Sequence, residues 1–207
     1  MEKFTRIAAT ACPLPMENID TDQILPARYL KLPRKGEHGK VLFHDLRFDA
    51  DGHERPEFPL NRPLWREAKI IVAARNFGGG SSREAAVYAL LDFSIRCVIA
   101  PSFGDIFAQN ATKNGLLTAV LGEAETNSLL LALEREPASV VTVDLVSQSI
   151  ACGQMQFQFF IDPSRRDRLL NGWDDFDVTN SFRNEISGFK EADRKSRPWA
   201  VPHGRDN

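Results

Sequence analysis

The sequence predicts an α/β protein in which a mixed sheet is flanked by helices. Short, largely apolar runs at residues 70–74, 96–101 and 116–121 are typical of strands buried on both faces. Amphipathic stretches of helical length follow at residues 102–114 and 126–135. Strands that alternate with helices in this way indicate a sheet with parallel strands, covered by the helices between them.

The composition excludes several classes of protein. With 207 residues, 43% hydrophobic and 26% charged, the chain has the composition of one globular domain with or without an appendage. Its formal charge is −2 and it has no long basic block, which argues against a nucleic-acid partner. No segment approaches the roughly 18 apolar residues of a membrane helix, and no signal-peptide core begins the chain. We therefore expect a cytoplasmic protein without a membrane partner.

The other elements are predicted from local patterns. Residues 4–10 are expected to form a first strand, turned by Pro13 and Pro15. A helix is expected to follow Glu84, where apolar residues recur at helical spacing. The later expected elements are strands at 140–145 and 154–161 and a short helix at 165–171 that is closed by Gly172.

Two segments show no sustained periodicity. Residues 27–66 are rich in proline, glycine and charge, and segments of this length are usually lids, binding loops or partly disordered. Residues 173–207 are polar and are expected to be partly loosely ordered, above all over residues 190–207. We therefore predict a main domain over residues 1–172, followed by a C-terminal extension over 173–207.

The cysteines and histidines predict no metal site in this chain. The three cysteines are far apart in sequence and include no C-x-x-C pair. The histidines likewise lack the paired spacing of metal ligands. The residues concerned are Cys12, Cys97, Cys152, His38, His44, His53 and His203.

The strongest candidate for a functional site is the glycine–serine loop NFGGGSSRE at residues 76–84. It lies between a predicted strand and a predicted helix, which is where small anionic ligands bind in open α/β sheets. One alternative is purely structural, because residues 81–84 fit the S-x-x-E capping box. A nucleotide site is disfavoured, because neither G-x-G-x-x-G nor G-x-x-x-x-G-K-[ST] is present.

The loop also fits a carboxylate site with a serine base. Arg83 offers a forked pair of donors that matches a carboxylate, and Ser82 and loop N–H groups add further donors. A neutral serine is a poor base, so it would need the positive potential of a helix N-terminus and nearby cations. Such a reaction would also need an electrophile such as a metal, which would have to come from another subunit.

A second polar cluster lies near the N-terminus, where Asp20 and Asp22 flank Thr21 within an apolar segment. On an extended backbone the two carboxylates would face the same side. They are expected either to cap a helix or turn, or to orient a partner side chain or ligand.

Five motifs together resemble the small-subunit family of isopropylmalate dehydratases, the swivelling-domain partners of the aconitase superfamily. The resemblance covers almost the whole chain. The motifs are NIDTDQILP (18–26), LFHDLRF (42–48), NFGGGSSRE (76–84), APSFGDIFAQN (100–110) and FFIDPSRRDRLLNGWDD (159–175).

The resemblance implies roles for individual residues. Ser81 matches the catalytic base, which moves a carbon-bound proton. The substrate-binding positions are Ser82, Arg83, Asp20, Thr21, Asp22, Gly79 and Gly80. The turn formed by Tyr29, Leu30 and Lys31 is similar to the loop that tunes substrate choice in the superfamily.

The resemblance also implies a swivelling β/β/α fold and a hydro-lyase that isomerises 2-isopropylmalate to 3-isopropylmalate in leucine biosynthesis. The [4Fe–4S] cluster is expected on a separate large subunit, and the substrate is a small dicarboxylic hydroxy acid. Ala85 and Val87 depart from the family pattern, which has histidine and proline there. Substrates such as dimethylmalate, methylmalate or homoaconitate therefore remain alternatives, as does a non-catalytic carboxylate-binding or assembly module.

Overall fold

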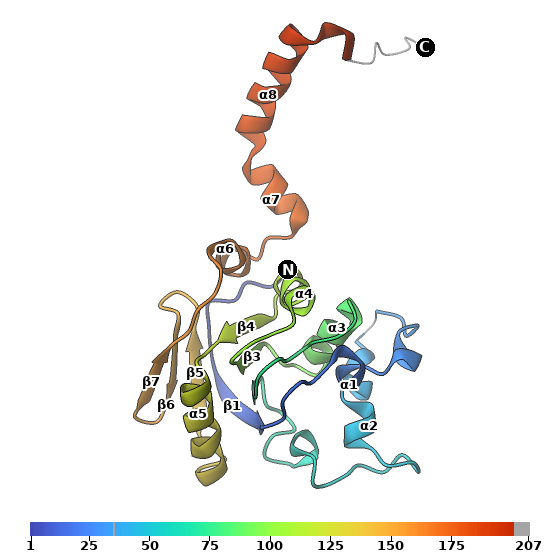
Figure 1. Cartoon of the computed structure of the whole chain (residues 1–207), viewed down its shortest axis with the longest axis vertical. Helices are drawn as coiled ribbons and strands as arrows, with labels where there is room; N and C mark the ends of the chain where they lie inside the picture. The colour runs from blue at the N-terminus through green and yellow to red at the C-terminus, as the bar shows by residue number, and fades with distance from the viewer. Residues whose placement is uncertain (35, 201–207) are drawn as a thin grey trace.

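A seven-stranded mixed sheet forms the centre of the protein, as a computed structural model that describes residues 1–34 and 36–200 shows (Figure 1). The strand order is β4-β3-β2-β1-β5-β6-β7. This arrangement, with helices packed on the sheet, confirms the predicted α/β fold. The strands are β1 (Arg6–Leu14), β2 (Ile70–Ala73), β3 (Cys97–Ala100), β4 (Leu117–Val120), β5 (Val140–Asp144), β6 (Ser149–Cys152) and β7 (Met155–Gln158).

The sheet has a parallel half and an antiparallel half. Strands β1 to β4 pair in parallel, whereas β5, β6 and β7 add to the other side of β1 in antiparallel fashion. Every residue of β2 and β3 is buried, because helices cover both faces of the parallel half. Ile71 packs in the core on one face and Ile70 in the core on the other, following the two-residue repeat of a strand.

The helices divide between these faces. Residues of α3 and α4 pack in one core, and residues of α5 pack in the other. The longer helices are α3 (Glu84–Asp92), α4 (Asp105–Asn114), α5 (Glu123–Arg135), α6 (Pro163–Asn171), α7 (Asp175–Ser181) and α8 (Arg183–Ser196). Gly115 ends α4 and Gly172 ends α6 in the left-handed conformation, which is the usual way for glycine to close a helix.

The first strand is longer than predicted and runs through Pro13. Strand β5 pairs with β1 only as far as Thr10, whereas β2 pairs with β1 from Ala11 to Leu14. One edge of β1 is therefore open at Pro13, where a residue without an N–H is tolerated. The expected turn at Pro13 is wrong for this reason.

Residues 27–34 and 36–66 contribute side chains to the core. They form the short helices η1 (Ala27–Tyr29), η2 (His38–Val41), α2 (His44–Arg47) and η3 (Pro59–Asn61). Leu42, Phe43 and Leu60 are fully buried in the same core as α3. Local periodicity missed this segment, because its apolar side chains are buried by contacts that are distant in sequence.

Smaller differences concern element boundaries. The predicted strand over 154–161 is shorter, and the strand β6 before it was not predicted. Helix α4 begins at Asp105, three residues after the start of the predicted stretch, and its Phe107 is 2% exposed while Ile106 is 47% exposed. Side-chain periodicity alone did not fix where this helix starts.

The C-terminal extension is mostly helical as far as residue 200. Helices α7 and α8 and the short η4 (Pro198–Ala200) project away from the sheet (Figure 1). Asp175 joins the start of this extension to the body through ion pairs with Lys113 of α4 and Arg168 of α6. Residues 201–207, with His203, lie outside the described part, and the division at 172/173 stays a prediction.

Among the described residues, none of the helices combines the length and the apolar character that a membrane crossing requires.

Candidate active site

The candidate site lies at the carboxyl ends of β1 and β2, where two of the predicted motifs meet. The chain after β1 runs alongside the chain after β2. Asn18 N–H donates to the Arg75 carbonyl at 2.9 Å, and Thr21 N–H donates to the Gly79 carbonyl at 2.9 Å. The Asp20–Thr21–Asp22 cluster is thereby held beside the glycine–serine loop, although about sixty residues separate them in sequence.

A third motif supports the loop from its other side. Phe77 N–H donates to the Ser102 carbonyl at 3.0 Å, and Gly104 N–H donates back to the Phe77 carbonyl at 2.9 Å. Two glycines make this close approach possible. A Cβ on Gly104 would lie 2.4 Å from the Gly78 carbonyl oxygen, and a Cβ on Gly78, whose φ is +76°, would lie 2.3 Å from the ring of Phe107.

The predicted catalytic residue is open to solvent. Ser81 and Ser82 are both exposed, so Ser81 is not enclosed in the core. The Thr21 hydroxyl donates a 2.8 Å hydrogen bond to the Ser81 carbonyl oxygen. Thr21 itself is only 1% exposed, and this bond fixes the backbone of Ser81 from the buried side of the loop.

The capping-box alternative for this loop is wrong. Helix α3 has Arg83 as its N-cap residue, and across the described chain no side chain makes a capping hydrogen bond there. Because the helix begins at Glu84, Ser81 lies two residues before the N-cap and is not in position to cap it. The Glu84 carboxylate instead accepts a 2.7 Å hydrogen bond from Asn114 of α4.

The two aspartates of the N-terminal cluster have different partners. Asp20 is the N-cap of the one-turn helix α1 (Thr21–Ile24), where it forms a reciprocal capping box with Gln23. The extended backbone assumed for this cluster is therefore wrong, and the capping alternative is confirmed for Asp20. Asp22 points to the glycine–serine loop instead and forms an ion pair with Arg83.

The turn at residues 29–31 lies next to α2. Tyr29 stacks on His44 with ring centroids 4.9 Å apart, and Arg28 pairs with Asp45, which lowers the pKa of the Asp45 carboxyl to about 2. The chain then returns to α3, where Arg34 lies 3.9 Å above the Tyr88 ring. Thus the described contacts join Tyr29–Leu30–Lys31 to α2, not directly to Ser81.

A polar cluster near the site was not predicted. Arg34 donates to Asn114 at 2.9 Å, and Asn114 in turn donates to Glu84 in the first turn of α3. Burial, followed by the hydrogen bond to Glu84, raises the pKa of Tyr88. These residues show no common spacing in sequence, so no local pattern could have grouped them.

The cysteines do not fit an iron–sulfur cluster. Cys12 and Cys97 pack in cores on opposite faces of the sheet, and burial raises the pKa of both thiols. A cluster needs several thiolates that converge on one point, which this placement prevents. Asp49, Asp51 and His53 do lie close enough to share an ion, but all three are exposed in a surface turn.

Comparison with known proteins agrees with this arrangement. A family model described as the aconitase C-terminal domain matches residues 1–124. A 3-isopropylmalate dehydratase small subunit of Rhodospirillum centenum is 47% identical over 202 residues, which cover 97% of this chain and all of that protein. The corresponding protein of Rhodospirillum rubrum is 48% identical and covers 96% of this chain and 97% of that protein.

A solved structure extends the similarity to the fold. The crystal structure of 3-isopropylmalate dehydratase from Methanocaldococcus jannaschii superposes with a TM-score of 0.65 at 25% identity. It covers 89% of this chain and 99% of that one, which confirms the expected swivelling-domain fold. The chain therefore belongs to the aconitase C-terminal domain family and, within it, to the 3-isopropylmalate dehydratase small subunits.

Proposed function

We propose that this chain is the small subunit of a two-chain hydro-lyase that interconverts 2-isopropylmalate and 3-isopropylmalate in leucine biosynthesis, in the cytoplasm. The observation that carries the proposal is the exposed Ser81, which lies beside Arg83 at the uncapped start of α3. The relatives that align with almost the full length of the chain support it.

Ser81 is the residue that we expect to move the proton. A serine hydroxyl is a poor base in water, and it becomes a better one only where positive potential stabilises its alkoxide. The first turn of α3 supplies such potential, because no side-chain oxygen within the described chain occupies its N–H groups. The hydrogen bond from Thr21 holds the Ser81 backbone in place and leaves the Ser81 hydroxyl free.

Arg83 is the residue that we expect to bind a substrate carboxylate. One of its nitrogens, Nη1, pairs with Asp22, and its side chain is 16% exposed. A guanidinium has five N–H donors, so this pair fixes the orientation of Arg83 while other donors remain available to a ligand. Asp22 then acts as a positioning residue, and the exposed Ser82 can add a hydroxyl to the same ligand.

The remaining predicted site residues would shape the surface around Ser81 and Arg83. Asp20 and Thr21 hold the adjoining backbone, and Gly80, whose φ of +88° favours glycine, lies beside them, because a Cβ added there would be 3.5 Å from the Asp20 Cβ. Gly79 and Gly80 leave the backbone bare, so a ligand can come close to it. The turn of Tyr29, Leu30 and Lys31 would contact the apolar substituent of the substrate.

The chain would act only with a large subunit. A dehydration needs an electrophile, and the thiols of this chain do not fit a cluster, so the [4Fe–4S] centre would belong to the partner. The residues of this chain would bind, orient and deprotonate the substrate. Val87 is fully buried and packs in the core, so this departure from the family pattern does not by itself favour another substrate.

Activity of the assembled enzyme tests the proposal. The chain would be purified anaerobically with its large subunit, and the ultraviolet absorbance of the unsaturated intermediate would be followed. Ser81→Ala is expected to lower kcat by about 10²- to 10⁴-fold, the usual contribution of a general base. Ser147→Ala, at an exposed serine between β5 and β6, is the matched control and should retain full activity. Undiminished activity of Ser81→Ala would remove Ser81 as the base.

A further inference from the structure

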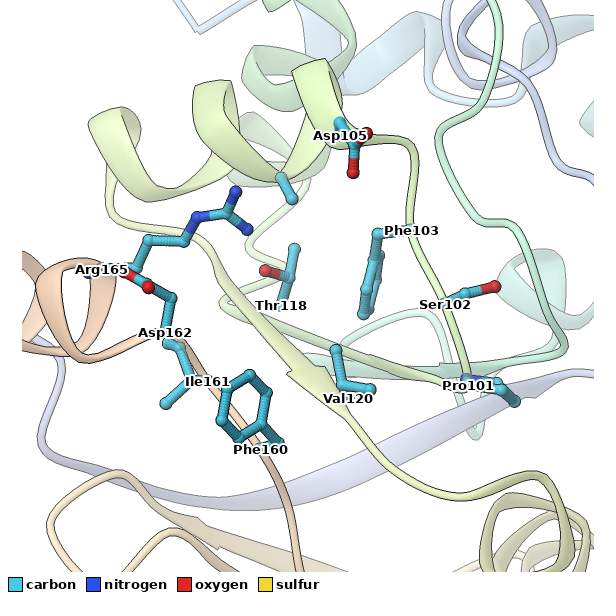
Figure 2. A pocket seen from close by; sticks show the side chains of 11 residues that line it. Pro101, Ser102, Phe103, Asp105, Thr118, Val120, Phe160, Ile161, Asp162 and Arg165 are labelled. Carbon is cyan, nitrogen blue, oxygen red and sulfur yellow. Dashed lines mark hydrogen bonds between the residues drawn. The ribbon is translucent and has the colours of Figure 1, made fainter.

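A cavity lies between α4, the end of β4 and the start of α6. Its volume is about 390 Å³, which is in the range of small-molecule sites. Figure 2 shows its apolar wall, formed by Phe103, Val120, Phe160 and Ile161. The part contributed by residues 160–165 belongs to the FFIDPSRRDRLLNGWDD motif, to which the proposed function assigns no role.

Arg165 brings an unpaired positive charge to this cavity. Its guanidinium extends from α6 toward α4 (Figure 2), and within the described chain it makes neither a hydrogen bond nor an ion pair. The neighbouring arginines of the motif are engaged. Arg166 donates to the Leu145 and Val146 carbonyls at 3.1 and 2.8 Å, and Arg168 pairs with Asp175. Arg165 thus differs from them in having no structural partner.

Thr118 of β4 adds a polar group to the cavity. The residue is only 4% exposed, and its side chain lies among those that line the cavity (Figure 2). A threonine hydroxyl that faces a cavity can donate a hydrogen bond to a ligand there. Together with Arg165, it offers hydrogen-bond donors to a carboxylate.

A negative charge borders the same cavity at Asp105. This carboxylate in the first turn of α4 pairs with no cation among the described residues, and no ion pair joins it to Arg165. Asp162 also lines the cavity, but its Oδ1 is occupied as the cap of α6, accepting from the N–H groups of Ser164 and Arg165. The cavity is therefore lined by one guanidinium and two carboxylates, with an apolar wall beside them. Asp162 is engaged as the cap of α6, whereas Asp105 and Arg165 form no ion pair with each other and can each take a ligand group.

We propose that this cavity binds an α-amino acid with an apolar side chain. Arg165 and Thr118 would bind its carboxylate, Asp105 its ammonium group, and Phe103 and Phe160 its side chain. A simple carboxylic acid would leave Asp105 unpaired, and a simple amine would leave Arg165 unpaired, so the zwitterion fits best. The site is separate from Ser81 and Arg83 and does not depend on the hydro-lyase activity.

Calorimetry on the full chain tests this site, first alone and then assembled with its large subunit. The probes are L-leucine and L-phenylalanine, with glycine, 4-methylpentanoate and 3-methylbutylamine as matched controls that each lack one recognised group. We expect saturable binding of the two apolar amino acids to both preparations, and binding of each control to be weaker by about tenfold or more, as for the loss of a charge-assisted contact.

Variants identify the groups that bind. Arg165→Gln and Asp105→Asn should each weaken binding of L-leucine about tenfold. Arg194→Gln, in the exposed α8, controls for charge, and Arg83→Gln tests separation from the candidate active site. Both of these should bind as the unaltered chain does.

Three results would overturn the proposal. They are the absence of saturable binding, equal binding of 4-methylpentanoate and L-leucine, and unchanged binding by Asp105→Asn, an exposed position where misfolding is not expected.

Discussion

The starts of α1 and α3 lie next to each other, yet they are built in opposite ways. The first turn of α1 is closed by Asp20 and Gln23, which bond to each other's backbone at 2.7 and 3.0 Å. The first turn of α3 has Arg83 at its N-cap position and no side-chain cap from the described residues. The closed helix start holds Thr21 beneath Ser81, and the open one faces the solvent.

This contrast determines which helix start can bind a ligand. Unpaired N–H groups at a helix N-terminus are satisfied by a side chain, by water or by a bound anion. At α1 the Asp20 side chain satisfies an N–H group, so this helix start stabilises and positions the site. At α3 no side chain of the described residues does so, and its N–H groups can bind a ligand. The sequence S-S-R-E is compatible with a capped and with an uncapped helix start. The residue at which the helix begins decides between the two.

The largest loss of stability is expected where the loop before α3 packs on α4. In Gly78→Ala, the added Cβ would meet the Phe107 ring while φ remains at +76°. We expect the free energy of unfolding to fall by about 3 kcal/mol, from strain and overpacking together. Gly52→Ala, with φ +82° and nothing within 4 Å, should lose only about 1 kcal/mol. Denaturant unfolding compares them, and equal losses would contradict this account of the packing.

The next effect concerns the open helix start alone. Arg83→Gln removes a charged donor, and we expect KM for 2-isopropylmalate to rise about thirtyfold, equivalent to roughly 2 kcal/mol. The control is Arg75→Gln, on the same loop as Arg83. It breaks an exposed ion pair with Glu17 and should leave KM unchanged. Steady-state kinetics of the assembled enzyme measure both. If the two variants behave alike, Arg83 does not bind substrate.

Removing the cap of α1 tests the closed helix start. Asp20→Ala should reduce the free energy of unfolding by about 1 kcal/mol, because the cap of α1 is lost. Ser81→Ala should change it by less than about 0.5 kcal/mol, because Ser81 caps nothing. Thermal or urea unfolding of the isolated chain is sufficient. A similar loss in both variants would mean that Ser81 has a capping role after all.

The smallest effect is a pH dependence at a third helix start. The Ser164 hydroxyl and the Arg165 N–H lower the pKa of Asp162, which caps α6. A lowered pKa in the folded state stabilises the protein above the unfolded value of about 3.9, and this contribution is lost as the pH falls further. Carbon-13 NMR titration of the Asp162 carboxyl measures the shift. Asp162→Asn should remove this part of the acid sensitivity, and an ordinary pKa would contradict the prediction.

The sequence predicted those parts of the molecule that local chemistry determines. Strands such as Cys97–Ala100 and the glycine that ends α4 follow from short apolar runs and from backbone preference. The path of β1 through Pro13 does not follow from a local pattern, because it depends on where β5 stops pairing with β1. The packing of Leu42 and Phe43 likewise depends on α3, which is far away in sequence.

The same limit applies to the site. The Gly78–Glu84 loop, the exposed Ser81 and its position before a helix could be predicted, because strand, loop and helix are consecutive. The partners of Asp22 and Thr21 could not be predicted, because they are set by the pairing of separate segments. The assignment of roles to these residues came from the family resemblance and stays a prediction.

The hydrogen bond from Thr21 to Ser81 has a consequence for how the protein folds. It joins residues 60 positions apart, and the ion pair of Asp22 with Arg83 joins residues 61 positions apart. Contacts of this kind form only after a long loop has closed, and closing such a loop slows folding. The site is therefore expected to appear late, once β1 and β2 have paired, so a folding intermediate that contains every helix can still lack a place for the substrate.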